Sequence, residues 1–356
     1  LFDLGVRTAR DPAGALGSWT SREPLAIAIP DGTRRLNLPL ALRALTARMQ
    51  NRGPVVIGLG LHRRMRADEL TELAPWDPQQ HDPDDCVETA TVAGIPGAVG
   101  RPVAEAPWSI SVSVGELHQY AGISGGHKGV AVGCGGRETI AALHHRDRVI
   151  APGVEVGRLE GNPFRMAIDA LGEAARCRLT LMYLPALDVW MAGDPKQVVL
   201  EATRRLSPWT PVTGPAQGAN LHVAGVKAVS LYQASRAATY LGLSPAPPLV
   251  PGATIALTAA CPEGLGAEEG FRRALQSGSA PWSHLLQGEP PSGPGAQRAV
   301  MLALLLARYR LVVYGVRDPG PLRAVGIPAH CGPAPEEPTW LQVPDPFQSL
   351  PQLAPA

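Results

Sequence analysis

The sequence predicts an α/β protein of two domains, each built on a largely parallel sheet, with an active-site cleft between them. Two observations support this prediction. Apolar segments with the length of buried strands alternate with segments that repeat apolar residues at helical spacing, and this alternation is the order of strand–helix–strand units. The chain also has 356 residues, more than one hydrophobic core usually serves.

The first strand–helix–strand unit begins at residue 25. Residues 25–30 are apolar throughout and end at Asp31, which predicts a buried strand. A helix is expected to begin at Asn37 and to end before Gly53, and residues 55–59 predict a second buried strand. Because ligands gather at the carboxyl ends of parallel strands, the residues that directly follow these two strands are candidates for a binding site.

The same pattern predicts the remaining elements. We expect strands at residues 108–114, 178–184, 189–192, 254–260 and 311–316, and helices at residues 137–145, 195–206, 226–241, 267–276 and 296–307. Residues 207–218 are rich in proline and glycine, which favours a linker. The predicted domains are therefore residues 1–206 and 219–330, followed by a proline-rich tail, residues 331–356, on the surface.

Composition narrows the class of ligand. Lysine and arginine total 32, and aspartate and glutamate total 31. This balance lacks the basic face that nucleic acids or anionic membranes attract, so we expect neither as a partner and favour a small molecule. Five cysteines without a CxxC pair favour a reducing, cytoplasmic compartment over a disulfide framework or a zinc knuckle.

The glycine-rich stretch at residues 122–136 is the first candidate site. It contains Ser124, Gly125 and Gly126 shortly before Lys128. Glycines let a backbone approach a ligand closely, and a lysine beside them is able to clamp a phosphate or to attach a group covalently. A cluster of turns with a solvated lysine is the ordinary alternative for such a stretch.

Polar side chains elsewhere form the second group of candidates. His62 and His118 each follow a predicted strand, and histidine is the usual acid or base near neutral pH. For either histidine alone, a buried structural role is the common alternative. Tyr232, Gln233 and Arg236 share one face of a predicted helix and, like Arg34, suit a carboxylate; a polar helix edge and a surface ion pair are the alternatives.

These residues together resemble the lactate racemase family, from about residue 25 to about residue 316. Lys128 has His118 ten residues before it and His144 sixteen residues after it, as family members do. The other matching positions are residues 31–34 (DGTR), 60–63 (GLHR), Ala121–Gly122, Ser124–Gly126, Thr139–Ile140 and Tyr232–Gln233. Residue types and long spacings that agree together are more specific than a single motif.

The resemblance implies a nickel-pincer nucleotide, a pyridinium mononucleotide with two sulfur donors, held covalently on Lys128. It implies nickel bound by the two sulfurs, a ring carbon and His144, a donor set that suits Ni(II). It implies that His62 and His118 act as acid and base. The remaining implied contacts are Asp31, Thr33, Ser124, Gly125 and Gly126 to the cofactor, and Arg34, Tyr232, Gln233 and Arg236 to the substrate.

The implied activity is racemisation or epimerisation of a 2-hydroxy acid by hydride transfer, with cofactor biosynthesis proteins as partners. Some positions depart from the family pattern: Arg236 stands where a lysine is common, and Ala296 where a tryptophan is expected. The matches are denser in the cofactor half than in the substrate half. Two alternatives stay open: a Schiff-base enzyme with pyridoxal phosphate on Lys128, and a relative that binds a small carboxylic acid or nucleotide without racemising it.

Overall fold

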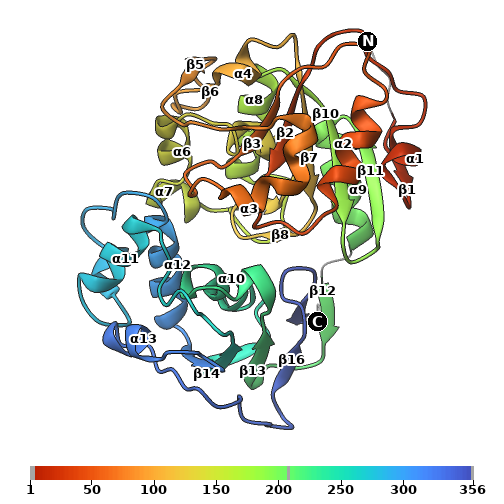
Figure 1. Ribbon diagram of the computed structural model, residues 1–356. Helices are drawn as coiled ribbons and strands as arrows, with labels where there is room; N and C mark the ends of the chain where they lie inside the picture. Colours follow the sequence, from red (N-terminus) through yellow and green to blue (C-terminus); the bar gives the residue numbers. More distant parts are fainter. Residues whose placement is uncertain (1–4, 207–208, 354–356) are drawn as a thin grey trace.

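The computed structural model describes residues 5–206 and 209–353 and contains two main sheets (Figure 1). Both are largely parallel, with helices packed against them, so the predicted α/β class is confirmed. In Figure 1 the part that ends at α9 lies above the part that begins at β12. Each part has its own buried apolar cluster. The division into two domains stays a prediction.

The first sheet has seven strands. Their order is β1 (Arg7–Ala9), β11 (Val189–Gly193), β10 (Cys177–Leu184), β7 (Ser109–Val114), β2 (Ala26–Pro30), β3 (Val55–Gly58) and β4 (Gln79–Gln80). The run from β10 to β4 is parallel, and β11 and β1 add an antiparallel edge. Two short hairpins lie outside it: β5 (Cys86–Glu88) with β6 (Ala98–Gly100), and β8 (Leu117–His118) with β9 (Gly122–Ile123).

Helices cover both faces of this sheet. Ile27 and Ile29 pack toward α1 and α2, whereas Ala26 and Ala28 pack toward α4 and α5. Burial on both faces is why β2 is apolar at every position. The helices of this part are α1 (Pro12–Leu16), α2 (Leu38–Thr46), α3 (Ala67–Leu70), η1 (Thr71–Trp76), α4 (Arg101–Ala104), α5 (Lys128–Ala131), α6 (Arg137–Leu143), α7 (Arg146–Val149), α8 (Pro163–Ala174) and α9 (Pro195–Leu206).

The second sheet has four parallel strands in the order β15 (Arg310–Tyr314), β14 (Leu249–Thr258), β13 (Ala216–His222) and β16 (Leu341–Val343). A separate pair joins β12 (Trp209–Val212) to β17 (Leu350–Leu353). The helices are η2 (Gly225–Lys227), α10 (Leu231–Gly242), α11 (Glu269–Gln276), η3 (Ser283–Leu286), α12 (Ala296–Leu306) and α13 (Gly320–Ala324). Every residue of α10 is buried, which places this helix inside the molecule.

Two segments that were expected to be irregular contain strands. The expected linker, residues 207–218, contains β12 and the start of β13, although residues 207–208 lie outside the described residues. The expected surface tail, residues 331–356, contributes β16 and β17 and buries Val343, Phe347 and Leu350; residues 354–356 also lie outside the described part. Proline is tolerated at the ends of strands and in edge strands. A proline-rich composition therefore did not exclude strand pairing in these two segments.

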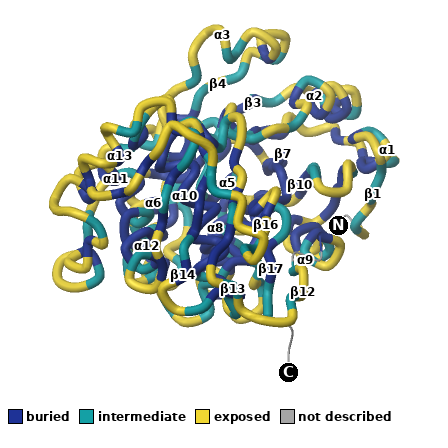
Figure 2. Tube along the Cα trace, turned by 90° about the horizontal axis from the view of Figure 1, so that it is seen from below, coloured by how far each residue is buried: buried dark blue, intermediate teal, exposed yellow. Residues whose placement is uncertain are grey.

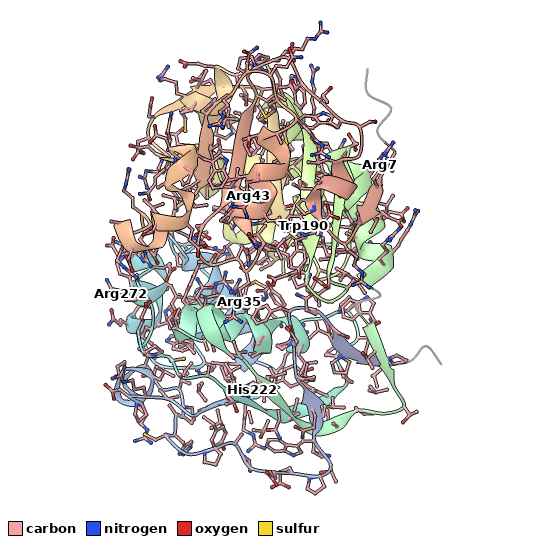
Figure 3. The ribbon with its side chains drawn as sticks, turned by 45° about the vertical axis from the view of Figure 1, so that its right-hand side comes forward. Arg7, Arg35, Arg43, Trp190, His222 and Arg272 are labelled. Atoms are coloured by element: carbon pink, nitrogen blue, oxygen red, sulfur yellow. The ribbon has the colours of Figure 1, made fainter. Side chains whose placement is uncertain are left out.

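The two parts of the chain are joined by several contacts. Met301 of α12 packs into the apolar cluster of Tyr120 and Phe164. The backbone N–H of Leu117 donates to the carbonyl of Phe347 at 2.8 Å. Figure 3 labels Arg35 at this junction, where it packs against Gly225 of the second part. Figure 2 shows α3 exposed at the periphery of the molecule, and none of its residues is buried.

None of the helices in residues 5–206 and 209–353 has the length and apolar character needed to cross a membrane.

Candidate functional site

The carboxyl ends of β2, β3 and β7 meet at one edge of the first sheet. Asp31, His62 and Glu116 lie just beyond these three ends. A cavity of about 660 Å³ opens there, between this edge and the helices α10 and α12 of the second part. That volume falls in the range of pockets for small molecules and cofactors. The position is the one that a parallel sheet predicts for a ligand.

The structure brings nearly all the predicted site residues to this cavity. Those that line it are Asp31, Thr33, Arg34, His62, His118, Ser124, Gly125, Lys128, His144, Tyr232, Gln233 and Arg236. Gly126 does not: it faces α9, where an added Cβ would lie 2.7 Å from Val199. Gly126 therefore shapes the turn before Lys128, with a φ of +61°, and its contact with the cofactor stays a prediction.

Asp31 holds His62 in one orientation. Oδ2 of Asp31 lies 2.8 Å from Nδ1 of His62, and Oδ1 accepts from the Thr33 hydroxyl at 2.5 Å. Burial of Asp31 opposes ionisation, but His62, Thr33 and Arg34 outweigh it and hold the pKa of Asp31 well below its usual range. The ionised carboxylate accepts the Nδ1–H of His62. The lone pair of neutral His62 is then on Nε2, as a general base requires.

The Nδ1 atom of His118 accepts hydrogen bonds, whereas the Nδ1 atom of His62 donates one. Its Nδ1 accepts the backbone N–H groups of Tyr120 and Ala121, at 3.2 and 3.1 Å. Two donors at Nδ1 leave the proton of the neutral ring on Nε2. Burial, together with the charges of Lys128 and Arg34, holds the pKa of His118 well below its usual range. His118 is therefore neutral at pH 7 and offers an N–H donor, whereas His62 offers a lone pair.

His144 offers the cavity an imidazole nitrogen with a free lone pair. Its Nδ1 donates to the carbonyl of Ile140 at 2.9 Å, which leaves Nε2 with a free lone pair. Burial lowers the pKa of His144 to about 4, so protons do not compete for that lone pair at neutral pH. The rings of Tyr120 and Phe164 pack edge-on against the imidazole, with centroids 6.0 and 5.5 Å away, and fix its plane.

Lys128 lies at the centre of the cavity wall, at the start of α5. Burial lowers the pKa of its amine to about 7, with further contributions from Arg34, Arg165 and Arg236. Such an amine is neutral, and hence nucleophilic, in a large fraction of molecules at physiological pH. The other two lysines of the chain are Lys196 and Lys227, and both carry ion pairs to carboxylates.

This pKa gives the first testable prediction. Acylation of Lys128 by a small amine-specific reagent should rise with pH and reach half its maximal rate near pH 7, because only the neutral amine reacts. Lys196 is the matched control, since its ion pair with Glu173 raises its pKa and keeps it protonated across that range. Mass spectrometry of the separate lysine peptides measures both. Identical profiles for Lys128 and Lys196 would contradict the assignment of Lys128 as nucleophile.

A buried ion cluster supports the loop that carries Lys128. Asp169 of α8 accepts from Arg165 through both carboxylate oxygens, at 2.9 and 3.1 Å, and lies 3.0 Å from Nδ1 of His127. The Arg165 side chain is 3% exposed. Its Nη1 also reaches the carbonyls of Ile123 and Gly125. The cluster thus ties α8 to both ends of the glycine turn.

Replacing Asp169 by asparagine should lower the free energy of unfolding by about 3–5 kcal/mol, because it leaves the buried Arg165 without its carboxylate. The control is Glu173→Gln on the same helix. Glu173 pairs with Lys196 where both side chains are about half exposed, so its loss should cost less than about 1 kcal/mol. Urea denaturation at pH 7 measures both variants. Equal losses would show that the cluster does not support the loop.

The substrate end of the cavity is rich in guanidinium groups. Arg34 Nη1 lies 3.4 Å from Glu116, whose other carboxylate oxygen is 2.5 Å from Lys227. Burial alone would raise the pKa of Glu116, but Arg34 and Lys227 lower it, so this carboxylate is ionised. Arg236 lies over the Phe347 ring, and burial lowers its pKa to about 10, so it stays charged at pH 7. Both arginines are available to a substrate carboxylate.

The chain's own metal ligands are few. Within the described residues there is no cluster of three or more His, Cys, Asp or Glu side chains that could hold an ion. The imidazole of His144, with a free Nε2, and the amine of Lys128 face a cavity of suitable size. These groups fit a metal whose other donors belong to a bound cofactor that is attached through an amine. They do not fit a metal held by the protein alone.

Sequence reasoning missed three residues of this site: Glu116, Tyr120 and Arg298. Glu116 comes two residues after β7, so the rule about carboxyl ends of strands applied to it as much as to Asp31. Arg298 is the one charged residue of the apolar helix α12, which was a signal in itself. Tyr120 stands beside the glycine-rich stretch, and nothing in the sequence distinguished it from a core tyrosine.

Comparisons with known proteins agree with this geometry. Residues 14–157 match the family model described as the lactate racemase N-terminal domain. The fold is similar to the lactate racemase apoprotein of Thermoanaerobacterium thermosaccharolyticum, with a TM-score of 0.80 at 18% identity over 99% of this chain and 97% of that one. A Thermotoga maritima protein matches with a TM-score of 0.71 at 15% identity, over 92% of this chain and 93% of that one. At such identities the two structures establish the fold alone. A search of curated proteins finds no match.

Proposed function

Because residues 14–157 match the model of the lactate racemase N-terminal domain, we propose that the chain is a racemase or epimerase of a 2-hydroxy acid that uses a nickel-pincer nucleotide. The resemblance seen in the sequence is confirmed for this part of the chain. One observation carries the proposal: Lys128, His144 and two histidines with opposite proton arrangements face the same cavity. The hydrogen bonds of His62 and His118 favour opposite tautomers, and burial lowers the pKa of both Lys128 and His144.

The cofactor is assigned to Lys128 and His144. The neutral amine of Lys128 is the group that a covalent bond to the nucleotide needs. The free Nε2 of His144 is the one ligand that the protein supplies to nickel. When bound, the pincer nucleotide supplies reversible removal of a hydride from C2 of the substrate.

The protein's own groups orient the acid and move its hydroxyl proton. Arg34 and Arg236, with Tyr232 and Gln233 beside them, receive the carboxylate. His62 accepts the hydroxyl proton at Nε2, and Asp31 stabilises the imidazolium that results. His118 donates a hydrogen bond from Nε2 to the same oxygen and stabilises the negative charge left there once His62 has taken the proton. Closure of the cavity by α10 and α12 excludes water from the oxidised substrate.

The test is to produce the chain together with the cofactor biosynthesis proteins, supply one enantiomer of a 2-hydroxy acid deuterated at C2, and separate the products by chiral chromatography. Hydride transfer within the site predicts that the opposite enantiomer keeps its deuterium. An enzyme that removes a proton from C2, such as a Schiff-base enzyme with pyridoxal phosphate on Lys128, would lose the label to solvent. Binding without interconversion would identify a relative that only binds the acid.

A further inference from the structure

Arg298 is a charged residue in an apolar setting. It lies in the first turn of α12, whose other residues are uncharged and mostly buried. Its guanidinium carbon lies 4.3 Å from the centroid of the Tyr232 ring, and both side chains line the cavity. A cation in such a helix has no role in solvation. Its position indicates a role toward what the cavity holds.

No carboxylate neutralises this cation within the described part of the chain. Arg298 forms no ion pair there, and its buried Nε has no hydrogen-bond partner. Glu268 and Glu289 also line the cavity, but neither forms an ion pair with Arg298. Buried donors of a guanidinium are rarely left unpaired, because the lost hydrogen bonds to water are not replaced. An anion from outside the chain would accept the hydrogen bond that this Nε–H is able to donate.

Two further polar groups at the cavity lack partners. The buried hydroxyl of Tyr120 has none, and neither has the buried Nη2 of Arg236. Arg298 lines the same cavity as His118 and His144, the groups assigned to the reaction. An anion at Arg298 would therefore be part of the reacting molecule rather than bound at the rim.

A single carboxylate does not account for these groups. The proposed function already uses Arg34 and Arg236 for the carboxylate beside C2. Glu116 neutralises only one charge of the pair Arg34 and Lys227. Arg298 remains as a further unpaired cation. On the basis of that proposed function, we propose that Arg298 binds a second anionic group of the substrate, and that the substrate is a 2-hydroxy dicarboxylic acid.

The test compares ligands of one shape and different charge. Isothermal titration of the cofactor-loaded full chain is performed with malate, with 2-hydroxyglutarate, and with 2-hydroxy-4-methylpentanoate, which matches malate in shape but has a neutral side chain. We expect a dicarboxylic acid to bind best. Arg298→Gln should weaken dicarboxylate binding about 10- to 100-fold and leave binding of the monocarboxylate unchanged. Arg298→Lys should bind the dicarboxylate better than Arg298→Gln does, because it keeps the positive charge.

Arg272→Gln is the control, because Arg272 is exposed on α11 and points outward in Figure 3. An equal loss for mono- and dicarboxylates in Arg298→Gln would overturn the proposal, since Arg298 would then bind the carboxylate beside C2. Loss of the cofactor's mass increment in that variant would also overturn it, because the anion at Arg298 would be the nucleotide phosphate. The titration detects binding whether or not the ligand is turned over, so charge-selective binding without racemisation would contradict the proposed function and leave this inference intact.

Discussion

Replacing Lys128 by methionine should abolish both cofactor attachment and racemisation. Methionine keeps the unbranched stem but has no amine, so no covalent bond to the nucleotide can form. Because the cofactor supplies the hydride step, the loss should approach the whole rate acceleration, about 10⁶-fold or more. On protein made with the biosynthesis proteins, intact mass and nickel content measure cofactor attachment, and chiral chromatography measures racemisation.

The fold should survive this change. An amine whose pKa falls to about 7 in the folded state is held there against its preference for water, so its removal should not lower the melting temperature. Lys196→Met is the matched control, since that lysine lies on the surface of α9 and should leave mass increment and activity as they are. A Lys128→Met protein that keeps the full increment would refute the covalent assignment.

The second large effect concerns the two histidines that face the hydroxyl group. His62→Gln and His118→Gln should each lower kcat/KM by about 10²- to 10⁴-fold, the usual contribution of a positioned acid or base. Nickel content should stay unchanged, because His144 is retained in both. The equilibrium constant between enantiomers is one, so each variant must lose the same factor in both directions.

Asp31→Asn tests the arrangement around His62. An amide in place of the carboxylate no longer stabilises the imidazolium, so activity should fall while nickel binding persists. His222→Gln is the control, because His222 is exposed on β13 and lies in the lower part of Figure 3; about a twofold change is the largest expected. Full activity in both His62→Gln and His118→Gln would show that the hydroxyl proton moves by another route.

The sequence predicted the elements whose pattern is strongest. The strand at β2 and the helix α9 appear at or within one residue of their expected bounds, because apolar runs and helical periodicity leave little freedom there. Asn37 was expected to begin a helix, and its side chain does accept the N–H of Leu40 as the N-cap of α2. Local signals were sufficient in these cases.

Long-range contacts decide the elements that the sequence did not predict. The helix α8 was missed, although Asn162 caps it through the N–H groups of Phe164 and Arg165. The strand β13 fell partly in a stretch that reads as a linker, and its pairing with β14 is what makes it a strand. The helix expected from residue 226 begins instead at Leu231, after η2, because Ser230 supplies the cap.

In the candidate site, too, local signals were predictable from the sequence and long-range contacts were not. Lys128, His118 and His144 were found by their spacing and do face one cavity. The distinction between the two histidines was not predictable, because it depends on a carboxylate 31 positions away in one case and on backbone N–H groups in the other. Proton positions are properties of the folded neighbourhood, and no spacing rule encodes them.

The segment from β16 to β17 also has a bearing on the order of events during synthesis. Phe347 lies under Arg236 and Lys227, and Gln348 reaches Glu116. These two residues leave the ribosome more than two hundred positions after Lys128 and His144. The amine and the imidazole are therefore made early, and the residues that steady the arginines above them arrive late. The end of the cavity beside Arg34 and Arg236 is thus completed only after synthesis has run about two hundred residues past Lys128 and His144.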